Sequence, residues 1–231
     1  MSPPSLEQRA EKRLGSTLRE RYRLVSVLGI GGMATVYLAQ HRNGNRVALK
    51  MLHAELSVEE DLRARFVREG YVANAIEHPG TVRVLDDDVA EDGSAFLVME
   101  LLEGATVYDR ARALGGTLSI EEVTWLGWHL LDVLAAAHEK GVIHRDIKPE
   151  NLFVTDQGAL KVLDFGIARV RDGSGSAPTR TGRAMGTPAF MPPEQALGRQ
   201  SEIDPRTDVW AVGATLFSPL SGQPVHLATT P

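Results

Sequence analysis

The sequence contains no cysteine, so disulfide bonds, thiolate metal sites and cysteine nucleophiles are excluded. Long apolar runs are also absent. None approaches the roughly 20 residues that span a bilayer, and the N-terminal region lacks the apolar stretch of a signal peptide. A positive net charge is missing too, because 25 lysines and arginines stand against 30 aspartates and glutamates. We therefore expect a cytoplasmic chain that has no membrane span and binds no nucleic acid.

What is present is ordinary for a folded protein, with 43% hydrophobic and 24% charged residues over 231 positions. This length allows one large domain or two small lobes around a shared cleft. The prolines and mixed charge of residues 1–20 predict a flexible leader. Strand patterns follow, with Asn43-Gly44 as a hairpin turn. The predicted strands cover residues 22–28, 35–39, 46–50, 82–89 and 95–100.

Helical patterns alternate with these strands and then dominate. Ser57 and Glu60 have capping-box spacing for a helix that should end before His78-Pro79, and Ser119 with Glu122 repeats that spacing before a long amphipathic segment. The remaining expected elements are strands over 152–154 and 160–163, a loop over 171–183 and a helix from about residue 207. The order predicts an α+β fold with a β-rich lobe over 21–100 and an incomplete helical lobe over 101–231.

A glycine-rich segment, residues 29–36, stands between the first two predicted strands. Glycine lets backbone N–H groups approach phosphate oxygens because no Cβ intervenes. A strand pattern rather than a helix follows the glycines, so the segment suits a β-hairpin over phosphates. This order argues against a dinucleotide-binding oxidoreductase, whose glycines would open a helix.

Two charged residues of the β-rich part indicate a function only when they are considered as a pair. Lys50 ends the segment Val47-Ala48-Leu49-Lys50, and Glu69 lies in the helix that follows. Either residue alone reads as a solvated surface charge. As a pair, Glu69 could orient the Lys50 ammonium towards the phosphates of a nucleotide.

The octet from His144 to Asn151 carries the strongest chemical signal. Phosphoryl transfer to a hydroxyl needs a carboxylate for the proton, a cation near the moving group and an oxygen ligand for magnesium. Asp146, Lys148 and Asn151 supply these three. Asp164, which follows the apolar strand over 160–163, adds a carboxylate of the kind that magnesium prefers. We expect these side chains and Lys50 to converge on one cleft.

In this order the motifs resemble the eukaryotic-like protein kinases, especially the bacterial serine/threonine branch, over roughly residues 20–222. Lys148 and Gly186-Thr187-Pro188 look like the serine/threonine class rather than the tyrosine class. The resemblance implies that Asp146 is the catalytic base, that Lys148 neutralises charge on the γ-phosphoryl group, and that Thr187 buttresses both. It also implies that Asp208 holds the catalytic loop from behind.

The resemblance further implies ATP as substrate, protein substrates as acceptors, and Mg²⁺ held by Asn151 and Asp164, with Mn²⁺ as an alternative. The implied ATP-binding residues are Leu28, Gly29, Gly31, Val36, Ala48, Lys50, Glu69, Met99, Glu100, Leu102 and Phe153. Among them Met99 would be the gatekeeper, and the backbone of Glu100 and Leu102 would bond adenine.

Regulation by phosphorylation is a hypothesis from the same resemblance. Arg145 would bind a phosphate on the loop between Asp164 and Glu194, and Thr179 and Thr181 would be its autophosphorylated residues. Dimerisation for autophosphorylation goes with this hypothesis. The alternative is that both threonines are ordinary loop residues.

Several positions depart from the family pattern. Ala34 stands where a third glycine is usual, Gly70 sits inside a helix and predicts mobility there, and Pro219 should break the hydrogen-bond ladder late in the last helix. The arginine that usually pairs with Glu194 is absent. The sequence therefore leaves two functions open: an active serine/threonine kinase, or a truncated kinase-like module that binds nucleotide or partners without turnover. It also leaves open whether the chain is a fragment or naturally short.

Overall fold

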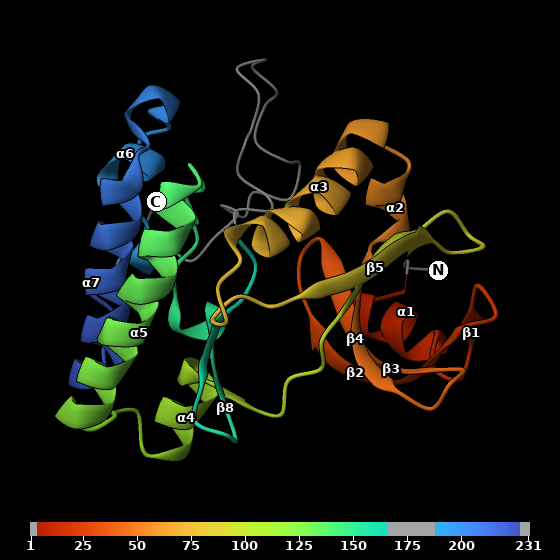
Figure 1. Cartoon of the computed structure of the whole chain (residues 1–231), viewed down its shortest axis with the longest axis horizontal. Coiled ribbons are helices and arrows are strands. Elements are labelled where there is room, and N and C mark those ends of the chain that lie inside the picture. Colours follow the sequence, from red (N-terminus) through yellow and green to blue (C-terminus); the bar gives the residue numbers. More distant parts are fainter. Residues whose placement is uncertain (1–3, 166–187, 227–231) are drawn as a thin grey trace. The chain divides into compact units, whose positions relative to one another are not determined.

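The computed structural model describes residues 4–165 and 188–226, apart from the side chains of Glu69 and Pro188. The chain divides into two compact units. The first comprises residues 1–74 and 82–102, and the second comprises residues 75–81 and 103–231. Figure 1 shows a sheet with helices in the first unit and mostly helices in the second. The predicted α+β composition, β-rich first and helical second, is confirmed.

The first unit is built on a six-stranded antiparallel sheet with the strand order β1-β2-β3-β4-β6-β5. The turn between β3 and β4 is the predicted Asn43-Gly44 hairpin, and Gly44 takes a positive φ of 93° that suits glycine. The strands are β1 (Thr17–Leu18), β2 (Tyr22–Ile30), β3 (Ala34–His41), β4 (Arg46–Leu52), β5 (Val84–Val89) and β6 (Ala95–Met99).

Alternation along these strands creates the core of the first unit, because every second side chain of a strand points to the same face. Leu24, Tyr37, Leu49 and Phe96 are almost wholly buried in one apolar cluster. This cluster holds β2, β3, β4 and β6 together and so fixes the strand that carries Lys50.

The N-terminal residues differ from the flexible leader that composition predicts. Residues Leu6–Lys12 form helix α1, whose first turn is closed by a reciprocal capping box between Ser5 and Gln8. Ala10 of this helix is buried in the apolar cluster. Arg13 donates to the carboxylate of Asp92 and to Ser94 Oγ, the latter at 3.2 Å. These contacts, with residues some 80 positions further along the chain, hold the N-terminal segment against the first unit.

Two helices follow β4, α2 (Ala54–Ser57) and α3 (Glu60–Ile76). The capping box predicted for Ser57 and Glu60 does not form, because Ser57 belongs to α2. Its hydroxyl donates to the carbonyl of His53 and accepts from the N–H of Ala95, both at 3.3 Å. A long-range strand contact has therefore taken the side chain that the local pattern assigned to a helix start.

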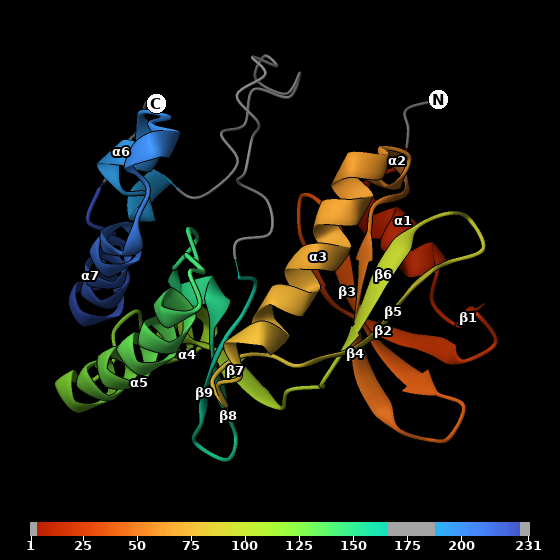
Figure 2. The same cartoon turned by 45° about the horizontal axis from the view of Figure 1, so that its top comes forward.

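The second unit contains a three-stranded sheet of order β7-β8-β9 and a packed pair of long helices, α5 and α7, which lie side by side in Figures 1 and 2. Ser119 caps α5 as predicted, accepting from the N–H of Glu122 at 3.2 Å. The elements are β7 (Gly104–Thr106), α4 (Val107–Ala113), α5 (Ile120–Glu139), β8 (Leu152–Thr155), β9 (Leu160–Val162), α6 (Pro193–Ala196), α7 (Pro205–Ser221) and the short 3₁₀ turns Pro149–Asn151, Pro188–Phe190 and Gln200–Glu202.

Helix α7 continues through Pro219, which lacks the N–H for one bond of the helical ladder. It ends two residues later, where Gly222 adopts a left-handed conformation with φ of 75° and its N–H returns to the carbonyl of Ser218. A proline this close to the C-terminus of a helix removes a single ladder hydrogen bond, so the helix survives it.

Candidate active site

The loop 144–151, which the resemblance identifies as the catalytic loop, is held by the first turn of α7. A capping box between Asp204 and Thr207 and a proline at the first helical position start this helix. Asp208, one residue on, is wholly buried. Its carboxylate accepts from the backbone N–H groups of His144 and Arg145, both at 2.8 Å, and lies 2.7 Å from Nε2 of His138. This confirms that Asp208 holds the catalytic loop, as the resemblance implied.

His144 is a second buried link in the same loop. Its Nε2 lies 2.9 Å from the carbonyl oxygen of Leu163, which can only accept, and its Nδ1 accepts from the N–H of Asp146 at 3.2 Å. The ring is therefore neutral and protonated on Nε2. Burial lowers the pKa of His144, in keeping with a neutral ring. His144 thereby joins the residue before Asp164 to the backbone of Asp146.

The structure brings Asp146, Lys148 and Asn151 together. The ammonium of Lys148 is 3.0 Å from Oδ2 of Asp146. The side-chain amide of Asn151 donates to the same Oδ2 at 3.0 Å and to the main-chain carbonyl of Asp146 at 2.8 Å. One carboxylate is thus held between a cation and an amide, which fixes its orientation without removing it from solvent.

Two residues of this site occupy a backbone region that favours glycine. Arg145 has φ of 66° and Asp164 has φ of 53°. Such conformations are strained by roughly 1–3 kcal/mol and persist where the surroundings impose them. At Arg145 the imposing contacts are the hydrogen bond to Asp208 and a hydrogen bond from Nε2 of Gln195 to the Arg145 carbonyl at 3.0 Å. The loop is therefore preset rather than adjustable.

The orientation of Asn151 is compatible with its predicted role as a magnesium ligand. The amide nitrogen of Asn151 is turned to Asp146, so its carbonyl oxygen is the atom that can serve as a ligand. Asp164 contributes a carboxylate. Within residues 4–165 and 188–226, no group of three or more histidine, aspartate or glutamate side chains is arranged to hold a metal. Magnesium commonly binds one or two protein oxygens and completes its shell with phosphates and water.

The predicted nucleotide-binding residues of the first unit fall on the hairpin β2–β3 and on strands β4 and β6. Gly29 pairs with Val36 across the hairpin, and the N–H of Gly31 donates to the carbonyl of Ala34 at 2.8 Å, so the glycine-rich segment is a β-hairpin as predicted. Lys50 lies on β4, is 8% exposed and pairs in register with Val36 on one side. Leu28 is half exposed beside the glycines.

Strands β4 and β6 place the other predicted residues of this unit. Ala48 pairs with Met99 in register. The N–H of Glu100 donates to the carbonyl of Arg83 at 3.0 Å, so its carbonyl, rather than its N–H, is the group suited to adenine. Leu102 ends the first unit, and Glu69 lies in α3. Phe153 belongs to β8 of the second unit, where it pairs with Thr106 and Lys161.

Thr179, Thr181 and Thr187, together with Gly166 and Gly186, lie outside the described residues. Sequence reasoning missed two contacts of α7, one with the loop 144–151 and one with α6. Thr215 donates to the carbonyl of Ile147 at 3.2 Å, and Thr207 donates to Glu194 at 2.7 Å. The second gives Glu194 a partner other than the arginine that is usual in the family. No pattern in the sequence predicts either contact.

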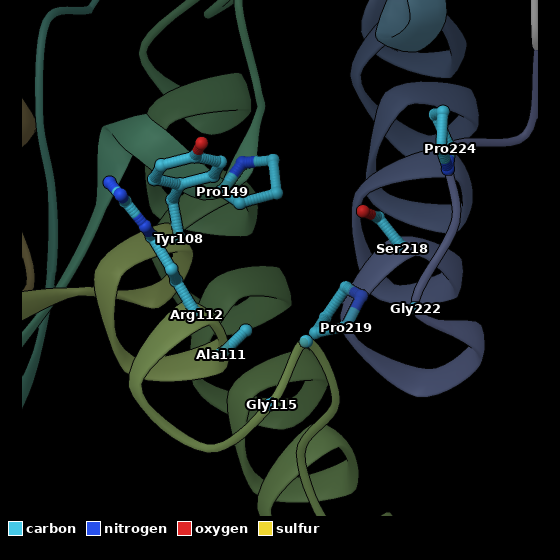
Figure 3. A pocket seen from close by; sticks show the side chains of 10 residues that line it. Tyr108, Ala111, Arg112, Gly115, Pro149, Ser218, Pro219, Gly222 and Pro224 are labelled. Atoms are coloured by element: carbon cyan, nitrogen blue, oxygen red, sulfur yellow. The ribbon is translucent and has the colours of Figure 1, made fainter.

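Pro149 of the catalytic loop also forms one wall of a pocket of about 430 Å³ in the second unit. In Figure 3 Tyr108 and Arg112 of α4 lie beside Pro149, with Ser218 and Pro219 of α7 across from them. None of the residues predicted to bind ATP or magnesium lines it. The pocket is therefore separate from the residues that are predicted to bind ATP and magnesium.

The fold and the site together define a protein kinase domain. The sequence matches the family described as protein kinase domain over residues 22–230, and the chain belongs to that family. No helix in the described part of the chain is both long and apolar enough to cross a bilayer.

Particular relatives are bacterial. The chain is 39% identical over 208 residues to serine/threonine-protein kinase pkn2 of Myxococcus xanthus, covering 88% of this chain and 24% of that protein. It is 36% identical over 220 residues to PknB of Mycobacterium tuberculosis, covering 94% and 35% respectively. The crystal structure of the PknI kinase domain of M. tuberculosis superposes with a TM-score of 0.71 at 28% identity, over 94% of this chain and 80% of that one. The chain thus spans about a quarter to two fifths of the length of the curated relatives it matches.

Proposed function

We propose that this chain is a serine/threonine protein kinase that transfers the γ-phosphoryl group of ATP to protein hydroxyls. The observation that carries the proposal is the bracketing of Asp146 by Lys148 and Asn151, each 3.0 Å from the same carboxylate oxygen. A carboxylate held in this way can accept the hydroxyl proton of a substrate. The adjacent ammonium can balance the charge that develops on the transferred group.

Each residue has a separate part in this proposal. Asp146 orients the acceptor hydroxyl and takes its proton, and Lys148 faces the phosphoryl oxygens. Lys50 holds the inner phosphates of ATP, so the proposal requires Lys50 to reach the same nucleotide as the residues of the second unit. Mg²⁺, or Mn²⁺ in its place, would be held by Asn151 and Asp164 and would supply charge neutralisation on the phosphates.

The test is phosphate transfer from radiolabelled ATP to a generic acceptor protein by the wild-type chain and by Asp146→Asn. We expect the variant to lose at least about 100-fold in rate, the usual contribution of a positioned general base. Asp132→Asn is a matched control, because Asp132 is an exposed carboxylate of the same unit that contacts His78. Its rate should stay at the wild-type value.

The alternative is a kinase-like module that binds nucleotide or a partner without turnover. It predicts equal background transfer by the wild type and Asp146→Asn, with nucleotide binding retained in both. The intact set of polar catalytic residues favours the enzyme. Binding can be followed with a fluorescent ATP analogue, with Lys50→Met as the variant that should weaken it.

Activation by phosphorylation of Thr179 and Thr181, read by Arg145, belongs to the same proposal, with dimerisation as the route by which one copy phosphorylates another. Replacing both threonines with alanine should lower phosphate incorporation and slow turnover. Unchanged rates would leave them as ordinary loop residues. We place the reaction in the cytoplasm, where ATP is available.

A further inference from the structure

Helix α3 meets the sheet of the first unit through the residue that follows Glu69. A Cβ at Gly70 would lie 2.6 Å from Cδ1 of Leu97, a distance that real side chains do not reach. Leu97 is buried on β6. The glycine therefore permits a close approach of the helix backbone to the sheet.

Leu97 is the middle of a cross-strand row that contains Lys50. It pairs in register with Lys50 of β4 on one side and with Asp87 of β5 on the other. Gly70 consequently sits over the centre of the row Lys50–Leu97–Asp87. Both views show α3 running beside β5 within this unit (Figures 1 and 2).

Tyr71 ties the helix to the far end of that row. Its hydroxyl donates to Oδ1 of Asp87 at 2.5 Å. Hydrogen bonding to Asp87, with burial second, raises the pKa of Tyr71 to about 12, so the hydroxyl remains a proton donor at any physiological pH.

Asn74 makes a second tie to the same strand about one turn later. Its side-chain amide donates to the carbonyl of Val84 at 2.8 Å, and its carbonyl oxygen accepts from the N–H of Val84 at 2.9 Å. The helix is thus attached to β5 at positions 71 and 74, which lie on one face. Two ties on one side define how far the helix is rotated about its axis.

The rotation matters because Glu69 is the other neighbour of Gly70. Successive residues of an α-helix are about 100° apart, so positions 69 and 71 lie on opposite sides of Gly70. With position 71 on the β5 side, position 69 comes to the β4 side, where Lys50 stands.

We propose that Tyr71, through its hydrogen bond to Asp87, is a positioning residue for phosphoryl transfer: it sets the rotation of α3 about Gly70 and so holds Glu69 next to Lys50. This inference rests on the proposed kinase function and adds a residue to it. Tyr71 does not touch the nucleotide. It acts by raising the fraction of chains in which Lys50 is ready to bind phosphate.

The alternative to a positioning role is that the Tyr71–Asp87 contact is a surface hydrogen bond that only stabilises the fold. Tyr71 is 43% exposed, which is compatible with this alternative. The two readings differ in kinetics. Loss of positioning lowers the binding-competent fraction, which raises the apparent dissociation constant of ATP, and saturating ATP restores the rate. Loss of stability alone removes active protein, which lowers kcat and leaves KM unchanged.

The experiment compares Tyr71→Phe with Tyr22→Phe in the 231-residue chain. Tyr22 is a matched control because its hydroxyl also donates to a β5 carboxylate, Asp86, at 3.0 Å, but from β2 instead of α3. We expect Tyr71→Phe to raise the KM for ATP about three- to tenfold, the factor that one net hydrogen bond represents, with kcat little changed. Tyr22→Phe should leave the KM at the wild-type value.

Rescue and amide exchange complete the test. Asp87→Ala should reproduce the KM of Tyr71→Phe, whereas Asp87→Asn keeps an acceptor oxygen and should remain near wild type. Hydrogen exchange over residues 60–76 should quicken in Tyr71→Phe and Asp87→Ala only.

Three outcomes would count against the inference. An active wild type whose Tyr71→Phe variant keeps its KM, or shifts it no more than Tyr22→Phe does, overturns this inference alone. Unchanged exchange in α3 also overturns it. A wild-type chain that transfers no phosphate contradicts the proposed function and this inference with it.

Discussion

Asp208 binds the backbone of His144, 64 positions earlier in the chain, through a hydrogen bond of 2.8 Å. A second bond of the same length runs from the N–H of Arg145 to the other carboxylate oxygen. Because Asp208 is wholly buried, both bonds are shielded from water. The backbone of the two residues before Asp146 is therefore held by the first turn of α7.

The first prediction concerns this support. Asp208→Asn replaces one acceptor oxygen with an NH₂ group, which cannot accept from a backbone N–H. The loss of one buried partner should lower the free energy of unfolding by about 1–3 kcal/mol and slow phosphate transfer. Urea denaturation and the radiolabel assay measure the two effects. Asp132→Asn, on an exposed side chain, should change neither; a stable and fully active Asp208→Asn would refute the prediction.

The second prediction concerns Asn151. Asn151→Asp adds a carboxylate that would suit a metal but cannot donate to Asp146, and it places two negative charges side by side. We expect the rate of this variant to stay far below wild type at every Mg²⁺ concentration, as in Asn151→Ala. Magnesium titrations of the rate check this. Full recovery at high Mg²⁺ would mean that Asn151 serves only as a ligand.

A third prediction compares two glycines of the second unit. Gly104 has φ of 143°, and a Cβ there would lie 2.2 Å from the carbonyl oxygen of Val154, whereas Gly158 has φ of 75° with nothing within 4 Å. Gly158→Ala should cost about 1–2 kcal/mol of stability from backbone strain alone, and Gly104→Ala distinctly more. Thermal unfolding of both variants decides the order. Equal losses of stability in the two variants would contradict the prediction, because they would show that strands β7 and β8 can shift to accommodate the added Cβ.

The fourth prediction concerns pH. Burial lowers the pKa of His144 below its ordinary value of 6.5, which the unfolded chain retains. Between the two pKa values the unfolded chain binds more protons than the folded chain, so stability falls as the pH drops below about 6.5 and is fully present above it. Urea midpoints at several pH values measure this slope. His144→Gln should show a shallower loss, and an identical slope would contradict the assignment.

The sequence predicted the strands of the first unit well because alternation and the Asn43-Gly44 turn are local signals. It missed α1, although Ser5 and Gln8 have capping-box spacing, because the partners that fix the helix lie far along the chain. It misassigned Ser57 for the same reason, since Ala95 takes its hydroxyl. A local pattern cannot reveal which distant strand will compete for a side chain.

The candidate site shows the same division. The motif from His144 to Asn151 identified Asp146, Lys148 and Asn151 because the chemistry needs those residue types close together in sequence. The neutral tautomer of His144, the hydrogen bond from Gln195 to Arg145 and that from Thr207 to Glu194 could not be predicted. These contacts arise from chain crossings that only the folded second unit creates.

The anchoring of the catalytic loop on α7 limits how far this domain can be shortened. A fragment ending before Pro205 would retain Asp146, Lys148 and Asn151. It would lack the Asp208 carboxylate, which accepts hydrogen bonds from the backbone of this loop. We expect a piece with the proposed activity to extend at least to Thr215, which donates a hydrogen bond to the carbonyl of Ile147 in the loop. Any excised or fused version of this domain should be cut beyond that position.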